Sequence, residues 1–229
     1  MLPSRVGLKF AAEFLGTMLL LATVVGSGIM GESLANGNLA VALLANAAAT
    51  AGMLYVLTSL LAPLSGAHFN PAVTLVALSR RELGPRTAML FLLAQISGAV
   101  LGVWLAHLMF DAEILQSAVR VRTGVGQWVS EGVATFGLVL TVLLGARHRP
   151  AAVPALIASY IFAAYWFTAS TSFANPAVTL ARALTDTFAG VRPVDVPAFL
   201  AAQLAGAALA APCARALLTQ RVTKLQSSA

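Results

Sequence analysis

The chain has 229 residues, of which 59% are hydrophobic and only 10% are charged, and its formal net charge is +6. A soluble domain carries about 25% charged residues, so this composition excludes an ordinary soluble protein and indicates a membrane protein. The basic residues lie between apolar runs and form no basic patch on a soluble fold, which argues against a nucleic-acid partner. Because the chain has a single cysteine, Cys213, no intrachain disulfide can form.

Six apolar runs are long enough to cross a bilayer core of about 30 Å, which takes roughly 20 residues in a helix. In chain order they cover residues 8–30, 38–62, 86–110, 127–147, 150–170 and 196–218. Two shorter apolar segments, 70–80 and 175–184, begin with Asn-Pro and are too short to cross, which predicts re-entrant half-helices. We therefore expect an all-α membrane protein with six transmembrane helices and two half-helices.

The Lys and Arg residues between these runs predict the orientation of the chain, because basic residues are enriched in cytoplasmic loops. Ten fall on the side of the termini and four on the other, which places both termini in the cytoplasm and predicts a multi-pass protein of the cell (inner) membrane. The larger group is Arg5, Lys9, Arg80, Arg81, Arg86, Arg147, Arg149, Arg215, Arg221 and Lys224, and the smaller is Arg120, Arg122, Arg182 and Arg192.

Motifs of the first half of the chain recur in the same order in the second half. AAEFLGT at 11–17 corresponds to SEGVATF at 130–136, NPAVTL occurs at 70–75 and again at 175–180, and AQISGAVLG at 94–102 corresponds to AQLAGAALA at 202–210. Each half holds three spans, an odd number, so the second copy must be inverted in the membrane. The prediction is a single domain over 1–229 with inverted repeats at approximately 1–117 and 118–220 and a cytoplasmic tail at 221–229.

The two Asn-Pro pairs predict where the half-helices begin. Asn70 and Asn175 suit the N-cap, and Pro71 and Pro176 suit the first helical position, where a missing N–H costs nothing. In an inverted repeat these two N-termini meet head to head in the middle of the bilayer, and irregular backbone at that depth must be buried in protein or line a watery cavity. Their positive dipole ends repel cations, so the pattern predicts selective permeation of uncharged polar molecules.

Taken in order along the chain, AAEFLGT, SGAHFNPAVTL and AQISG resemble the major intrinsic protein family, the aquaporins and aquaglyceroporins, over nearly the whole chain. Exclusion of protons by half-helix dipoles is a known property of that family. The resemblance implies one pore per subunit, a homotetramer in the lipid bilayer, no cofactor and no catalysis. It also implies that the pore contains the motif residues Asn70, Pro71, Ala72, Asn175, Pro176 and Ala177, together with Gly66, Ala67, His68 and Phe173.

The resemblance further implies a narrow selectivity filter beyond the Asn-Pro-Ala level, formed by four positions at fixed distances from the two motifs. Carried onto this chain, these positions are Thr50, Ala163, Ser172 and Val178. Most family members carry arginine where this chain has Val178. Four small or medium-sized, uncharged side chains predict a wider and less polar filter, which would pass glycerol, urea or undissociated arsenious acid as well as water.

Arg182 and Asn46 lie one helical turn beyond two of the filter positions. Arg182 is four residues after Val178 and therefore on the same helix face, which predicts a charge moved from the constriction to the outer vestibule. The alternative is that Arg182 is a helix-end residue paired with Asp186. Asn46 is one turn outward of Thr50 and is expected to line the same outer vestibule.

Glu13 and Glu131 are acids within the predicted spans and leave two interpretations open. Intramembrane acids often mark a proton or ion pathway, which would suit a coupled secondary transporter with inverted repeats. Alternatively, each carboxylate accepts hydrogen bonds from the backbone N–H groups of a re-entrant loop, and their occurrence once per half favours this structural role. Three scattered histidines, His68, His107 and His148, form no metal-ligand pattern, and no nucleophile with a neighbouring base is present to predict an enzyme.

Overall fold

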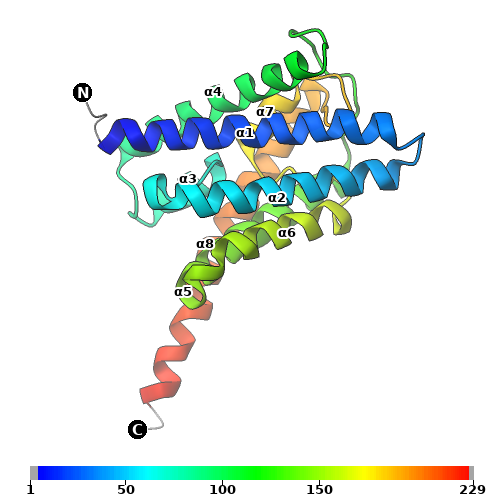
Figure 1. The fold of residues 1–229 in the computed structure, drawn as a ribbon. Coiled ribbons are helices and arrows are strands. Elements are labelled where there is room, and N and C mark those ends of the chain that lie inside the picture. Colours follow the sequence, from blue (N-terminus) through cyan, green and yellow to red (C-terminus); the bar gives the residue numbers. More distant parts are fainter. Residues whose placement is uncertain (1–4, 227–229) are drawn as a thin grey trace.

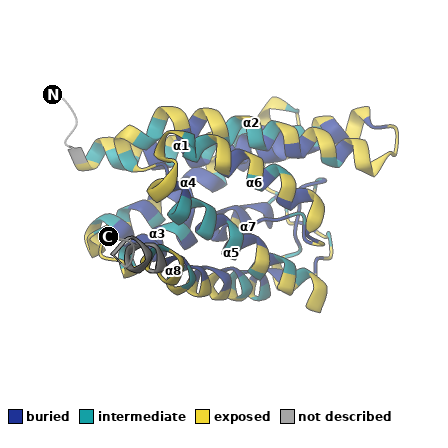
Figure 2. Cartoon of the chain, turned by 90° about the horizontal axis from the view of Figure 1, so that it is seen from below, coloured by how far each residue is buried: buried dark blue, intermediate teal, exposed yellow. Residues whose placement is uncertain are grey.

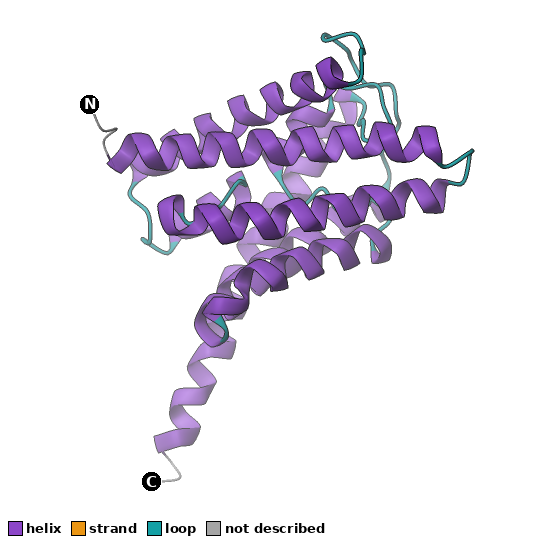
Figure 3. Ribbon diagram, in the orientation of Figure 1, coloured by secondary structure: helices purple, strands orange, loops and turns teal. Residues whose placement is uncertain are grey.

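The computed structural model describes residues 5–226 of the chain, with side chains described for residues 6–219. Within this range the chain is built from helices and loops (Figures 1 and 3). The helices are α1 (Arg5–Leu34), α2 (Leu39–Ser65), α3 (Pro71–Ser79), α4 (Pro85–Met109), α5 (Val125–His148), α6 (Val153–Phe167), α7 (Pro176–Arg182) and α8 (Val196–Gln226), with 3₁₀ turns at Pro150–Ala152 and Pro193–Asp195.

Six of the described helical segments are long and apolar enough to cross a membrane. They are Val6–Leu34, Leu39–Ser65, Pro85–Met109, Val125–His148, Pro150–Phe167 and Pro193–Thr219, which match the six spans expected from the sequence. The expected tail at 221–229 is a continuation of α8 as far as Gln226, and residues 227–229 lie outside the described residues. The chain is an all-α, multi-pass integral membrane protein.

Helices α3 and α7 begin abruptly at the predicted N-caps. Asn70 and Asn175 have extended backbones, and the side-chain oxygen of each accepts a hydrogen bond from the second helical residue, Ala72 N at 2.9 Å and Ala177 N at 3.0 Å. With 9 and 7 residues, respectively, neither helix can cross a bilayer. Both begin at buried N-caps and therefore present their N-termini to the interior of the bundle.

The helix pairs of the two halves repeat the same arrangement. Helix α1 packs against α4 and α2, as α5 packs against α8 and α6 (Figure 1). Helices α3 and α7 contact each other. A Cβ atom on Gly102 would clash with Met18 O of α1, and one on Gly206 would clash with Gly132 O of α5. These small residues let the helices of each pair approach closely, as the small-residue spacing in AQISGAVLG and AQLAGAALA predicts.

The outward faces of the long helices are exposed, whereas buried residues gather around α3 and α7 (Figure 2). Many of the exposed residues are large and apolar. Leu60 is 67% exposed and Leu209 is 65% exposed, while Phe91 and Phe199 are buried in the interior. Such an apolar perimeter suits contact with lipid. We call the end of the bundle that carries residues 35–38, 110–124 and 183–195 the loop side, and the opposite end, where α1 begins, the termini side.

Candidate pore and selectivity filter

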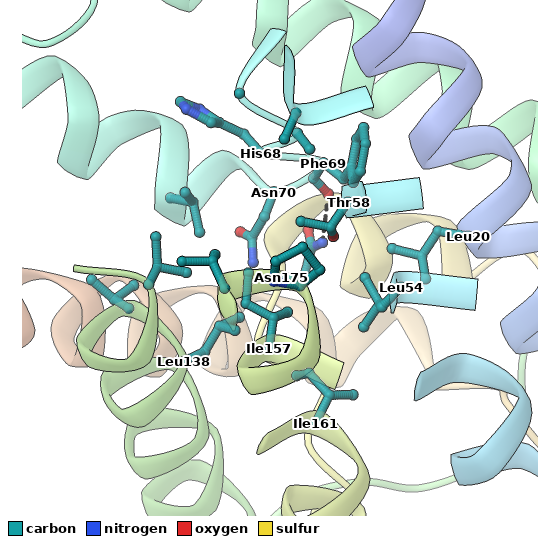
Figure 4. Close-up of a pocket in the computed structure, with 18 of the residues that line it drawn as sticks. Leu20, Leu54, Thr58, His68, Phe69, Asn70, Leu138, Ile157, Ile161 and Asn175 are labelled. Atoms are coloured by element: carbon teal, nitrogen blue, oxygen red, sulfur yellow. Dashed lines mark hydrogen bonds between the residues drawn. The ribbon is translucent and has the colours of Figure 1, made fainter. Parts of the chain in front are cut away.

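A cavity of about 490 Å³ lies between the helices, and residues from both ends of the bundle line it. Glu82 and Pro150 line it at the termini side, and Thr50, Val178 and Arg182 line it towards the loop side. Helices α2, α5 and α6 supply mostly apolar side chains to its wall, including Leu54, Leu138, Ile157 and Ile161 (Figure 4). An apolar wall with few polar groups binds passing polar solutes only at those groups.

Asn70 and Asn175 hold the two half-helices together at the level where they meet. The Nδ2 group of Asn70 donates to Ala174 O at 2.8 Å, and the Nδ2 group of Asn175 donates to Phe69 O at 2.7 Å. An amide nitrogen carries two hydrogens, so each Nδ2 keeps one hydrogen that no described residue accepts. Both asparagines line the cavity (Figure 4), so these two hydrogens are available to a solute at the positive ends of both half-helix dipoles.

The loops before the two half-helices have matching, strained backbones. Ala67 and Phe69 have φ of 51° and 48°, and the equivalent Ser172 and Ala174 have φ of 51° and 49°. Side chains other than glycine adopt this left-handed region at an energetic cost, so surrounding interactions must stabilise it.

Glu13 and Glu131 provide that stabilisation. Glu13 accepts hydrogen bonds from His68 N at 3.0 Å and Phe69 N at 2.8 Å, and Glu131 accepts them from Phe173 N at 2.8 Å and Ala174 N at 2.9 Å. Both carboxylates are fully buried, and neither is among the residues that line the cavity.

Two glutamines repeat the same bridge in the two halves. Gln95 on α4 donates to Glu13 at 2.7 Å and to Thr74 at 2.9 Å, and Gln203 on α8 donates to Glu131 at 2.6 Å and to Thr179 at 2.7 Å. Thr74 and Thr179 occupy equivalent positions of α3 and α7. Each acid is thus part of a network that fixes one re-entrant loop and one half-helix to the long helices.

Three of the four expected filter residues line the cavity. Thr50, Ser172 and Val178 are 3%, 2% and 5% exposed, respectively, and the Ser172 hydroxyl is buried without a hydrogen-bond partner. Ala163 is different, because it lies on the exposed face of α6 and is outside the cavity lining. The structure therefore does not place Ala163 beside the other three expected filter residues.

The helical periodicity of α6 explains why Ala163 faces away from the cavity. Ile157, Ile161 and Tyr165 are four residues apart and therefore share the face that lines the cavity. Ala163 is two residues from both Ile161 and Tyr165, which turns it by about 200° away from that face at 3.6 residues per turn. Tyr165 lines the cavity instead, and its hydroxyl donates to Thr50 Oγ1 at 3.3 Å.

Arg182 lines the cavity as a buried side chain, only 2% exposed, one turn beyond Val178. Its guanidinium carbon lies 3.4 Å from the centroid of the Phe173 ring, and its Nε donates to Ala189 O. Among the described residues Arg182 forms no salt bridge with Asp186, whose Oδ1 accepts from Val119 N at 3.1 Å.

Asn46 does not share the mouth of the cavity, contrary to expectation. It is 1% exposed, outside the cavity lining, and its Nδ2 donates to Val24 O at 2.8 Å and to Ser27 Oγ at 2.9 Å. A buried amide needs hydrogen-bond partners, and Asn46 finds both on α1. Its role in the structure is to join α1 to α2.

The other expected pore residues separate into two groups. Gly66, Ala67, His68 and Phe173 line the cavity with the two asparagines. Pro71, Ala72, Pro176 and Ala177 are buried behind it in the first turns of α3 and α7. The His68 ring is held by Nδ1 at 3.0 Å from Thr74 Oγ1 and by an edge-to-face contact with Phe91 at 5.4 Å between centroids.

Sequence reasoning missed Arg122, a buried side chain of the loop at 110–124. Its Nε donates to Gly190 O at 2.9 Å, its Nη1 donates to Ser170 O at 3.1 Å, and its guanidinium carbon lies 5.0 Å from the Phe173 centroid. Burial, followed by the nearby charges of Arg182 and Arg120, lowers the pKa of Arg122 well below its usual value. An arginine stays protonated at neutral pH even so. Sequence carried no local signal for this position, because the loop has no repeat equivalent.

These features define a class of protein: a bundle of six spanning helices around two capped half-helices, with a cavity that follows the line where the half-helices meet. A family model described as "Major intrinsic protein" matches residues 5–172. The chain is 56% identical over 210 residues to aquaglyceroporin AqpS of Rhizobium meliloti (strain 1021), covering 92% of this chain and 90% of that one.

More distant relatives belong to the same class of membrane protein. The chain is 32% identical over 246 residues to aquaporin PIP2-3 of Zea mays, covering 94% of this chain and 83% of that one. The X-ray structure of the aquaglyceroporin from Plasmodium falciparum has the same fold, with a TM-score of 0.69 at 18% identity, covering 91% of this chain and 95% of that one. The chain belongs to the major intrinsic protein family, and it is a membrane transport protein and not an enzyme.

Proposed function

We propose that this protein is a passive, wide-pore channel for water and small uncharged solutes, of the aquaglyceroporin type. The observation that carries the proposal is the continuous cavity past both Asn-Pro-Ala motifs, with Val178 where most relatives have arginine. Glycerol, urea and undissociated arsenious acid are the solutes we propose, because they combine small size with hydroxyl or amide groups. The name of the relative AqpS, an aquaglyceroporin, supports the same class of solute.

The proposed mechanism is selection by hydrogen bonding and electrostatics, without any covalent step. A solute that passes the half-helix junction exchanges water contacts for the free N–H hydrogens of Asn70 and Asn175. The two helix N-termini place partial positive charge at the same level, so a cation or a migrating proton meets a barrier there. Apolar side chains such as Ile157 and Leu138 bind no polar group, which keeps the solute moving.

Membrane placement and assembly follow from the distribution of charge and from the family. We propose that the protein lies in the cell (inner) membrane with both termini in the cytoplasm, since ten of its fourteen Lys and Arg residues lie on that side. On this orientation the loop side of the bundle faces outward. We also propose a homotetramer with one pore per subunit, as the family resemblance implies.

A coupled secondary transporter that uses Glu13 and Glu131 is the alternative function, but the environment of both acids favours a channel. Both carboxylates accept hydrogen bonds from two loop N–H groups and from a glutamine, and neither is among the cavity-lining residues. A coupling site must bind and release its ion during the transport cycle. Protonation of either acid would break hydrogen bonds that hold a re-entrant loop in place.

Substitution Val178→Arg tests the proposal in proteoliposomes without an ion gradient, with light scattering to follow osmotic swelling. The wild type should give rapid glycerol and urea flux with a low activation energy. An added steric barrier of about 1.4 kcal/mol slows flux tenfold, so we expect Val178→Arg to reduce glycerol and urea flux by about tenfold and water flux by less.

Val178→Leu serves as the control, because it adds a single methylene group and no charge, and it should have a smaller effect. Unchanged permeation of glycerol, urea and arsenious acid in Val178→Arg would remove Val178 from the filter. Flux by the wild type only under an imposed ion gradient would instead support the transporter.

A further inference from the structure

The half of the cavity towards the loop side contains a buried positive charge, and no carboxylate lines the cavity beside it. Arg182 is 2% exposed, and within the described part of the chain its guanidinium makes one hydrogen bond, from Nε to Ala189 O. Its Nη1 is buried without a partner. Among the residues that line the cavity, the single carboxylate is Glu82, which lies at the termini side and pairs with Arg80 at 2.7 Å.

Aromatic contacts hold the Arg182 guanidinium in one orientation. The Phe173 ring lies against it at 3.4 Å and packs edge-to-face on Phe199, with 5.2 Å between ring centroids. Arg122 contacts the same Phe173 ring, and the loop carbonyls of Gly190 and Ser170 fix its position. A guanidinium stacked on an aromatic ring presents its N–H groups edge-on, so Arg182 has a defined direction for donation.

A second unpartnered polar group lies in the same region. The Ser172 hydroxyl is buried without a hydrogen-bond partner, and both Ser172 and Arg182 line the cavity. Buried polar atoms that lack a protein partner are rare in folded proteins. Ser172 and Arg182 line the cavity together with the apolar Val178 and Phe173, and the protein leaves hydrogen-bonding capacity of both polar side chains unused.

We propose that Arg182 is the filter arginine of this channel. From one helical turn beyond Val178, it supplies the fixed positive charge and the N–H donors that most relatives place directly after the second Asn-Pro-Ala motif. The ligand class is an uncharged solute whose oxygen accepts from Arg182 while a neighbouring hydroxyl or amide group bonds Ser172. This inference rests on the proposed channel function, and it replaces the expectation of an uncharged filter with that of a recessed, charged one.

The displacement has a direct consequence for selectivity. Val178 leaves space at the level where the usual arginine would narrow the pore, while Arg182 keeps cations out of the same half of the cavity. Size selection and charge selection are therefore carried by different residues in this chain, so a substitution can change one without changing the other.

Urea and guanidinium form a matched pair of solutes for the test, because they have nearly the same shape and differ by one charge. We would measure the flux of both through proteoliposomes that contain the full-length wild type, Arg182→Gln, Arg182→Lys or Arg120→Gln. Arg120→Gln is the control, because Arg120 also lies over a phenylalanine, Phe188 at 5.0 Å, and bonds a carbonyl, but it does not line the cavity.

The wild type and Arg120→Gln should pass urea and exclude guanidinium. Arg182→Gln should raise guanidinium flux relative to urea flux by about tenfold, as expected for the loss of one charge at about 6 Å in a partly aqueous pore. Arg182→Lys should keep the exclusion of guanidinium, because it keeps the charge, and should lose part of the urea flux, because it loses the planar set of donors.

Equal guanidinium-to-urea ratios in Arg182→Gln and in the wild type would overturn the proposal, as would a wild type that passes both solutes equally. The second outcome needs no variant and so remains decisive if Arg182→Gln fails to fold. Failure of the wild type to conduct urea, glycerol or water would instead overturn the channel function, so the two failures are distinguishable.

Discussion

Glu131→Gln separates the structural role of the buried acid from a role in proton coupling. In the wild type, Oε1 accepts from Phe173 N at 2.8 Å, and Oε2 accepts from Ala174 N at 2.9 Å and from Gln203 Nε2 at 2.6 Å. Glutamine has nearly the same shape but only one acceptor oxygen. Whichever way its amide turns, its NH₂ group faces at least one N–H donor of the loop.

The cost of this substitution follows from those three bonds. One backbone N–H group is left buried without an acceptor, which costs about 1–3 kcal/mol, and the remaining bonds lose the assistance of a full charge, worth about 1 kcal/mol more. We therefore expect Glu131→Gln to lose about 2–4 kcal/mol of stability. The channel that does fold should keep the wild-type flux per molecule, because Glu131 does not line the cavity.

The assay has two parts: thermal unfolding of the purified protein in detergent, followed by size-exclusion chromatography, and glycerol flux at several external pH values. Glu113→Gln, on an exposed residue of the loop at 110–124, is the control and should change neither measurement. A Glu131→Gln protein as stable as the wild type would refute the structural reasoning. Flux driven by a proton gradient in the wild type, and lost in Glu131→Gln, would show that the acid couples transport to protons.

Two further predictions concern packing and the loop side. Gly206→Ala should weaken the α5–α8 contact by about 1–3 kcal/mol through overpacking, because its Cβ would clash with Gly132 O. Gly52→Ala in α2 is the control: open space surrounds Gly52, so this variant should be neutral or stabilising in the same thermal assay. His107→Leu should free the loop at 110–124, because the buried His107 ring contacts Ile114 O at 3.0 Å and Thr185 Oγ1 at 2.8 Å. Limited proteolysis should therefore cut this loop faster in the variant than in the wild type. Equal cutting rates would show that other contacts hold the loop.

The sequence by itself determined the spans, the half-helices and their N-caps. Span length and hydropathy depend only on local composition, because a bilayer selects for continuous apolar length. Asn70–Pro71 and Asn175–Pro176 act within one helical turn, so their effect did not depend on distant contacts. The inverted arrangement also followed from sequence, because it needed only the order of motifs and an odd number of spans per half.

Only the tertiary structure decided which face of each helix meets the cavity and which partners the buried polar groups find. Distance from a motif along the chain placed Ala163 in the filter, but the rotation of α6 turns Ile161 and Tyr165 inward instead. The surroundings of Arg182 are set by Phe173 and Ala189, which lie on loops that sequence alone does not place beside it. The physical reason is that hydropathy and capping act along the chain, whereas helix rotation and loop packing minimise the free energy of the whole bundle.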